Sequence, residues 1–186
     1  MTSIEVFFGV ILLLFGLIGV VRGFLRELGV TLIMLFLLYF LSQFEPLLLK
    51  GLSRVVAVGR PTAAHTMENP ICFWVFTVFL MGVAFVSYQG QTLTYPGSAP
   101  SGTMGFVLGA VTGLVNGYLI AGSVWYYMHQ FNYPITWLGF SAEKLSSFSR
   151  GIIEFLPINF LGQPIFLGQS LLLYLAIMLL LARVIH

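Results

Sequence analysis

The stretch GFVLGAVTGLVNGYLIAG, residues 105–122, decides the fold, because it has the length of a helix, no formal charge and glycines four residues apart. These glycines are Gly105, Gly109, Gly113 and Gly117. In water, glycine weakens a helix by about 1 kcal/mol relative to alanine. In a bilayer, lipid tails are as apolar as leucine, so helices associate instead through close backbone contact across small residues. The stretch therefore predicts a membrane helix with a neighbouring helix packed on its glycine face.

The composition of the whole chain is that of a membrane protein. Charged residues make up 8% of the sequence and apolar residues 59%, and the mean hydropathy is +0.99. A typical soluble domain carries about 25% charged residues. The formal net charge is only +2, without the clustered cations that phosphate binding needs. We therefore expect the lipid bilayer as the main surroundings of the chain and no nucleic-acid partner.

Five long apolar runs predict an all-α integral membrane protein with five transmembrane helices. A helix of about 20 residues, rising 1.5 Å per residue, crosses a hydrocarbon layer of about 30 Å. The runs cover residues 4–21, 28–44, 71–88, 106–128 and 165–182. Gly168 and Gln169 interrupt the start of the fifth run, so a shorter re-entrant or interfacial piece stays open there as the alternative.

Two connecting segments predict amphipathic helices in the membrane interface. They lie near residues 46–58 and 141–155, where apolar residues recur at helical spacing. Ser141 is the expected N-cap of the second helix and Pro157 its expected stop. With five spans, both helices share a side with the N-terminus, and that side holds five Lys and Arg residues against three on the other. The positive-inside rule then predicts a cytoplasmic N-terminus.

Small residues in the first span predict which helix covers the glycine face. Gly16, Gly19 and Gly23 offer a complementary surface, so we expect the first and fourth spans to form a close pair. Asn116 lies beside the glycine face near mid-span. A buried amide needs hydrogen-bond partners, which Thr112 one turn earlier or a facing helix would supply. A place on a substrate or ion pathway is the alternative for Asn116.

The segment between the first two spans has the pattern R-G-F-x-R-E. Its members are Arg22, Gly23, Phe24, Arg26 and Glu27. Taken alone, the residues indicate a tight turn whose charged side chains anchor at the headgroups, and a partner-binding or conducting role is the alternative.

This pattern and the glycine-rich stretch together resemble the two signature segments of the colicin V production protein (CvpA) family of small bacterial inner-membrane proteins. The second signature reads like D-R-x-L-G-x-x-x-G-x-x-R-G-x-L. Five of its positions are in register here, namely Leu108, Gly109, Gly113, Gly117 and Leu119. Gly105 and Phe106 replace the Asp-Arg pair, and Asn116 replaces the later arginine. Charged partners that the first signature would find in the second are thus expected to be lost.

The resemblance covers residues 1–128, which would form a four-helix core, whereas residues 129–186 would add an interfacial helix and a C-terminal span. It implies a multi-pass protein of the bacterial cytoplasmic (inner) membrane, linked to toxin export and envelope upkeep and without established enzymatic chemistry. We expect other integral membrane proteins as partners through the C-terminal span, and self-association stays open. A structural subunit of a bioenergetic or photosynthetic complex and a small channel or transporter are the alternatives.

Residues suited to catalysis or metal binding are few. The histidines are His65, His129 and His186, and the single cysteine, Cys72, lies in an apolar run as a small packing residue. None has the spacing of a metal site, and no nucleophile motif or pair of acids occurs. We therefore expect no enzyme activity, cofactor or metal. For His129, beside three aromatic residues, an interfacial position is expected and a haem or chlorin ligand is the alternative.

Overall fold

The computed structural model describes residues 4–59, 64–89, 93, 95–135 and 139–185. Within these ranges, side chains are described except at residues 52–59, 64–69, 144 and 166. Predicted features that fall on other residues, such as His65 and His186, lie outside the described part of the chain.

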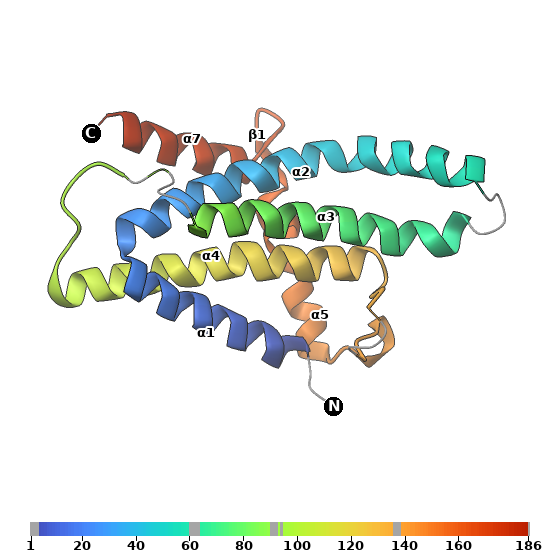
Figure 1. Ribbon diagram of the computed structural model, residues 1–186, viewed down its shortest axis with the longest axis horizontal. Helices are drawn as coiled ribbons and strands as arrows, with labels where there is room; N and C mark the ends of the chain where they lie inside the picture. The colour runs from blue at the N-terminus through green and yellow to red at the C-terminus, as the bar shows by residue number, and fades with distance from the viewer. Residues whose placement is uncertain (1–3, 60–63, 90–92, 94, 136–138, 186) are drawn as a thin grey trace.

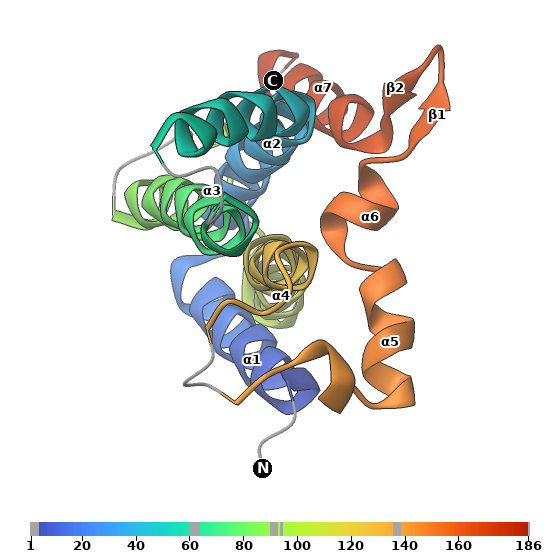
Figure 2. The ribbon, with the colours of Figure 1, turned by 90° about the vertical axis from the view of Figure 1, so that its right-hand side faces the viewer.

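Four long helices run antiparallel to their chain neighbours and form a bundle (Figure 1). They are α1 (Ile4–Arg22), α2 (Phe24–Gly59), α3 (Ala64–Gln89) and α4 (Gly102–Gln130). All four are long and apolar enough to cross a membrane. Viewed along the bundle, α4 lies at its centre and contacts α1, α2 and α3 (Figure 2). The predominantly helical fold is therefore confirmed, and four of the five predicted spans correspond to helices that could cross a membrane.

A single glycine reverses the chain between α1 and α2. Gly23 has φ = +88°, a conformation that residues with a Cβ rarely adopt. Its amide N–H donates to Gly19 O at 2.9 Å, and the Glu27 amide donates to Gly23 O at 3.2 Å. The turn therefore follows α1 directly and places Glu27 in the first turn of α2.

The predicted interfacial helix near residues 46–58 is not a separate element, because α2 continues through it to Gly59. Pro46 lies inside this helix. Proline removes one backbone hydrogen bond from a helix interior, but α2 continues past both Pro46 and Gly51. The predicted helical structure of residues 46–58 is therefore present, but as the C-terminal part of α2.

The C-terminal part is built from short elements that cross one side of the bundle, roughly at right angles to the long helices, and then turn back along α2 (Figures 1 and 2). These are η2 (Ala142–Lys144), α5 (Ser147–Glu154), α6 (Pro157–Leu161), the antiparallel strands β1 (Pro164–Phe166) and β2 (Gln169–Ser170), and α7 (Leu171–Val184).

The predicted helix near residues 141–155 is divided. Ser141 precedes only the 3-10 turn η2 and makes no side-chain cap. Ser146 is the N-cap of α5, since its Oγ accepts a hydrogen bond of 3.0 Å from the Ser149 amide. Pro157 begins α6 instead of ending α5. Proline is tolerated in the first turn of a helix because the backbone N–H groups there have no partner within the helix.

The predicted fifth span is shorter than the pattern suggested. Leu167 and Gly168 both have positive φ, 49° and 72°, and join β1 to β2 as a tight turn. Only the 14 residues of α7 remain helical. They extend about 21 Å along the helix axis, which is shorter than a hydrocarbon layer of about 30 Å. The buried residues Leu172 and Ala176 lie on α7, which packs against α2.

Candidate functional site

The glycine face of α4 contacts α1 so closely that no side chain fits between them. A Cβ on Gly19 would overlap Gly109 O and lie 2.7 Å from the Cα of Gly113. A Cβ on Gly113 would overlap Phe15 O and lie 3.1 Å from the Cα of Gly16. The predicted pairing of the first and fourth spans is therefore confirmed.

The two ends of the predicted small-residue faces have other roles. A Cβ on Gly105 would meet Pro100 O, so this glycine packs on the preceding loop and not on α1. Gly23 has open space around it and serves the turn through its φ angle. The close contact thus runs from Gly109 to Gly117, where a Cβ would lie 2.8 Å from the Phe15 side chain.

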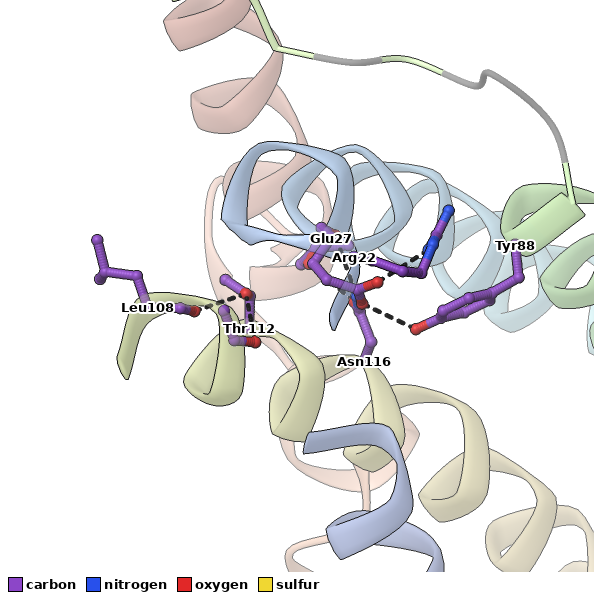
Figure 3. A network of polar contacts seen from close by, with 8 residues as sticks. Arg22, Glu27, Tyr88, Leu108, Thr112 and Asn116 are labelled. Atoms are coloured by element: carbon purple, nitrogen blue, oxygen red, sulfur yellow. Dashed lines mark hydrogen bonds and ion pairs between the residues drawn. The ribbon is translucent and has the colours of Figure 1, made fainter. Parts of the chain in front are cut away.

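This close approach brings the start of α2 against the middle of α4, and there the Glu27 carboxylate is completely buried. Its Oε1 accepts a hydrogen bond of 2.8 Å from Arg22 Nη1. Its Oε2 accepts bonds of 3.0 Å from the Tyr88 hydroxyl and 2.7 Å from Asn116 Nδ2 (Figure 3). The four long helices each contribute a residue to this contact set, which we call the Glu27 cluster and which also includes Thr31.

The amide of Asn116 is satisfied at both ends. Its Nδ2 also lies 3.0 Å from Glu27 O, and its Oδ1 accepts a bond of 2.7 Å from the Thr31 hydroxyl. The facing helix, α2, is therefore the source of partners. Thr112 is not: its hydroxyl donates within α4 to Leu108 O at 2.7 Å or Gly109 O at 3.1 Å.

The cation of the cluster is held from two sides. The Arg22 guanidinium carbon lies 4.5 Å from the centroid of the Tyr88 ring, while Nη1 pairs with Glu27. Cations over aromatic faces are attracted by the ring quadrupole. The Arg22 side chain is 19% exposed, so this ion pair has little water to weaken it.

The structure separates the charged residues that the sequence placed together at the headgroups. Glu27 is buried and Arg22 is largely so, whereas Arg26 is exposed. Headgroup anchoring is therefore wrong for Glu27. A lone buried carboxylate costs several kcal/mol, and the Arg22 charge with the Tyr88 and Asn116 donors offsets that cost. Phe24 is half-buried beside the turn.

Sequence reasoning missed Thr31 and Tyr88 as members of the cluster. Thr31 lies one helical turn after Glu27, on the same face of α2. That spacing is a signal, but it becomes informative only once Glu27 is known to be buried. For Tyr88, at the end of an apolar run, the sequence offers no signal that separates a cluster member from an interfacial tyrosine.

His129 is exposed near the C-terminal end of α4 and does not lie between helices. Its Nδ1 is 3.3 Å from the Tyr133 hydroxyl, which also accepts a 3.3 Å bond from Trp125 Nε1. Among the residues whose side chains are described, no three histidine, cysteine or acidic groups lie together as metal ligands.

A second polar cluster connects the start of α5 to α1. The Glu5 carboxylate accepts a bond of 2.9 Å from the Ser146 hydroxyl and a short bond from the hydroxyl of Ser149, which is buried. Further along, the Tyr118 hydroxyl donates to Phe155 O at 2.6 Å. The segment from α5 onward is thus attached to the bundle through specific side chains.

Comparison of the chain with protein-family models, with curated proteins and with solved structures finds no match.

Proposed function

We propose that this chain is a non-catalytic, multi-pass protein of CvpA type in the bacterial inner membrane, acting as an accessory to envelope or toxin-export processes or to the assembly of a membrane complex. The observation that carries the proposal is the contact between the two signature-like segments. Arg22 and Glu27 belong to the first and Asn116 to the second, and all three meet in the Glu27 cluster.

The substitution at residue 116 fits this proposal. An asparagine where the family pattern has arginine gives up a positive charge but keeps a donor, which here reaches Glu27 Oε2 at 2.7 Å. The charge that the carboxylate needs comes from Arg22 instead. The contact between the segments is thus retained in a polar form, although the sequence suggested that it was lost.

A non-catalytic role is supported by how the polar atoms of the cluster are used. Both carboxylate oxygens of Glu27 are bonded to side chains of the bundle, and both ends of the Asn116 amide are bonded as well. A network satisfied in this way holds helices in a fixed arrangement. We infer that its role is to lock α1, α2, α3 and α4 together.

The accessory role places the partner on the outer face of α7, in the region 129–186 beyond the CvpA-like core. Met178 and Leu181 are exposed there, one helical turn apart. We expect the double variant Met178→Ala/Leu181→Ala to lose co-purifying membrane proteins after mild solubilisation, as measured by native gel and mass spectrometry. The control is Leu13→Ala/Leu17→Ala on the exposed face of α1. Unchanged partners in the α7 variant would refute this placement.

A small channel or transporter is the second candidate, and the burial of Glu27 favours it, because ionisable residues inside membranes often mark ion or proton pathways. The test is ion flux into proteoliposomes that contain only this protein. A flux that Glu27→Gln abolishes would replace the accessory proposal with the transport proposal. No flux above protein-free vesicles is the result expected for an accessory protein.

A further inference from the structure

A pocket with a polar lining lies between α4 and the α5–α6 segment, which runs along one side of α4 (Figure 2). Its volume is about 570 Å³, within the range of about 300–1,000 Å³ that small-molecule sites occupy. The lining carries a carboxylate, two amides and a phenol. It consists of Tyr126 on α4, Glu154 on α5, Ile158 and Asn159 on α6, and Gly162, Gln163 and Pro164 after α6.

Two close contacts hold the walls of this pocket in place. A Cβ on Gly122 of α4 would lie 2.6 Å from Pro157 Cδ, so the start of α6 is seated directly on α4. The Tyr118 hydroxyl of α4 donates to Phe155 O, at the end of α5, at 2.6 Å. The pocket is therefore preformed between fixed elements.

The polar groups of the lining offer more acceptors than donors. Asn159 uses one N–H of its amide to bond Ile153 O at 2.8 Å, and its Oδ1 has no partner among the described residues. The Tyr126 hydroxyl interacts with the Glu45 carboxylate of α2, to which a phenol can only donate. Ionised Glu154 can only accept. A matching ligand therefore brings hydrogen-bond donors.

Glu154 also gives the pocket a negative charge. Its carboxylate is exposed and makes no hydrogen bond or ion pair with the part of the chain that the structure describes. Glu154 is the last residue of α5, and no basic residue lies in the last turn of that helix. Carbonyl groups make the C-terminal end of a helix partly negative, so a carboxylate is unfavourable there and a cation is stabilised. The pocket is thus suited to a cationic ligand.

The groups of the lining distinguish between kinds of cation. A divalent metal takes several charged ligands, and no three acidic, histidine or cysteine side chains lie together among those described. A quaternary ammonium has no N–H to donate and is held by a cage of aromatic rings, whereas this lining has one ring, that of Tyr126. A primary ammonium donates three hydrogen bonds and matches a carboxylate beside amide oxygens.

The place of the pocket in the bundle indicates where such an ammonium comes from. Tyr126 lies four residues before the end of α4 at Gln130, which is about 6 Å along the helix. At the same end of the bundle, α5 contacts the start of α1 through Glu5. In a membrane-crossing bundle the ends of the spans meet the lipid headgroups. The pocket is therefore within reach of a headgroup.

A cation next to Glu154 matches the other charge of a zwitterionic headgroup. Arg150 lies one helical turn earlier on α5, is exposed and makes no ion pair with the described residues. Residues at this spacing have Cβ atoms about 5–6 Å apart. In an ethanolamine headgroup the ammonium and the phosphate are separated by only two carbon atoms. Arg150 and Glu154 thus present the complementary pair of charges.

From the pocket, its carboxylate and the neighbouring arginine we propose that the α4–α5–α6 pocket binds the headgroup of phosphatidylethanolamine, with the primary ammonium on Glu154 and Asn159 Oδ1 and the phosphate on Arg150. The proposal goes beyond the accessory function and requires only that the bundle lies in a membrane. Its outcome is independent of whether the α7 variants lose their partners.

The test uses the full chain, delipidated in detergent and titrated with short-chain phospholipids, with bound lipid counted by native mass spectrometry. Phosphatidylethanolamine, its N-methyl and N,N-dimethyl forms and phosphatidylcholine differ in the number of N–H donors. We expect one phosphatidylethanolamine to bind about tenfold more tightly than phosphatidylcholine, since a hydrogen bond to a charged group is worth about that factor or more. Affinity should fall with each methyl group. Equal affinities across the series would overturn the ammonium assignment.

A soluble ligand separates the two sources of this chemistry. O-phosphoethanolamine carries the same ammonium and phosphate without acyl chains, and it should bind more weakly than the lipid because it buries no apolar surface. Binding as tight as that of the lipid would show that the pocket takes a soluble amine and would overturn the assignment to a headgroup.

Variants at exposed positions assign the residues without disturbing the buried core. Glu154→Gln should lose the preference for phosphatidylethanolamine over phosphatidylcholine, and Arg150→Gln should weaken both lipids alike, because both carry the phosphate. Glu143→Gln, exposed in η2 and outside the lining, is the control and should change neither affinity. A preference retained in Glu154→Gln would overturn the role of this carboxylate.

A charge placed in the lining tests the pocket itself. Gln163→Lys brings an ammonium of the protein into the pocket and should weaken phosphatidylethanolamine binding, whereas Gln163→Glu should leave it at least as tight. Gln130→Lys, exposed at the end of α4 and outside the lining, is the matched control and should have no effect. Equal losses in Gln163→Lys and Gln130→Lys would refute the pocket, since the lipid would then respond only to the overall surface charge.

Discussion

Asn116, in the middle of α4, donates a hydrogen bond of 2.7 Å to the carboxylate of Glu27, which lies 89 residues earlier in the chain. The bond joins the start of α2, where Glu27 ends the first signature-like segment, to the middle of α4, where Asn116 lies in the second. Because the carboxylate is completely buried, each of its partners affects the stability of the whole bundle.

Replacing Asn116 by leucine should lower the free energy of unfolding by about 1–3 kcal/mol, since it removes the amide donor that bonds the Glu27 carboxylate and backbone oxygen, while the Thr31 hydroxyl can still donate to Glu27 O at 3.0 Å. Thermal unfolding in detergent measures the change. The control is Thr112→Val, whose hydroxyl bonds only carbonyls of its own helix, four and three residues earlier. Equal unfolding midpoints for the two variants would contradict a role of Asn116 in holding the helices.

Removing the Arg22 charge should lower the free energy of unfolding more than replacing Asn116 does. We expect Arg22→Met to destabilise the protein by about 3–5 kcal/mol, because it leaves a buried carboxylate uncompensated. The double variant Arg22→Met/Glu27→Leu should recover most of this loss, since both charges are then absent. Additive effects of the two substitutions in detergent unfolding would show that the ion pair does not carry the coupling.

The glycine contact predicts a strong positional effect on stability. Gly113→Leu should force α1 away from α4 and lower the unfolding midpoint, because a side chain there overlaps the backbone of Phe15. Gly9→Leu is the matched control, since a Cβ on Gly9 meets nothing within 4 Å. Similar midpoints for the two variants would mean that the close contact contributes nothing to stability.

The contact of Glu5 with α5 should limit local unfolding of α5. Ser149→Ala removes a buried hydroxyl that bonds Glu5, so hydrogen exchange of the α5 amides should accelerate several-fold while exchange in α4 stays the same. Ser147→Ala, at an exposed position of the same helix, should leave exchange unchanged. Equal protection of α5 in both variants would show that Glu5 does not hold it.

The arrangement of the helices also predicts sidedness. In a Cys72→Ala background, cysteines introduced at Lys50 and Lys144 should react with an impermeant maleimide from one side of the membrane, and a cysteine at Ser98 from the other. Reaction of residues 50 and 144 from opposite sides would refute the antiparallel arrangement of the spans as membrane-crossing helices.

Features fixed by neighbours in the sequence were predictable. The spacing of Gly109, Gly113 and Gly117 predicted the α1–α4 contact because helical periodicity alone places these residues on one face. The tight turn at Gly23 was expected from its position between two apolar runs, but the positive φ angle of Leu167 was not predictable from that periodicity, so the hairpin there was missed.

Features fixed by distant residues were not predictable. The burial of Glu27 depends on Tyr88, 61 residues later, and on Asn116, 89 residues later. A single sequence does not reveal which polar residues of separate spans meet. Burial of a carboxylate is also unfavourable until those partners are known, so headgroup anchoring was the natural interpretation.

The short separation of Arg22 and Glu27 in sequence has a consequence for how the protein is made. Chains are synthesised from the N-terminus, so α1 and α2 emerge well before Tyr88 and Asn116 exist. During this interval the carboxylate has only the cation five residues before it as a partner. The Gly23 turn brings the two together within one hairpin, so the charge of Glu27 is balanced without any residue of α3 or α4. The later helices then complete the site in the order of their synthesis, α3 with its hydroxyl and α4 with its amide.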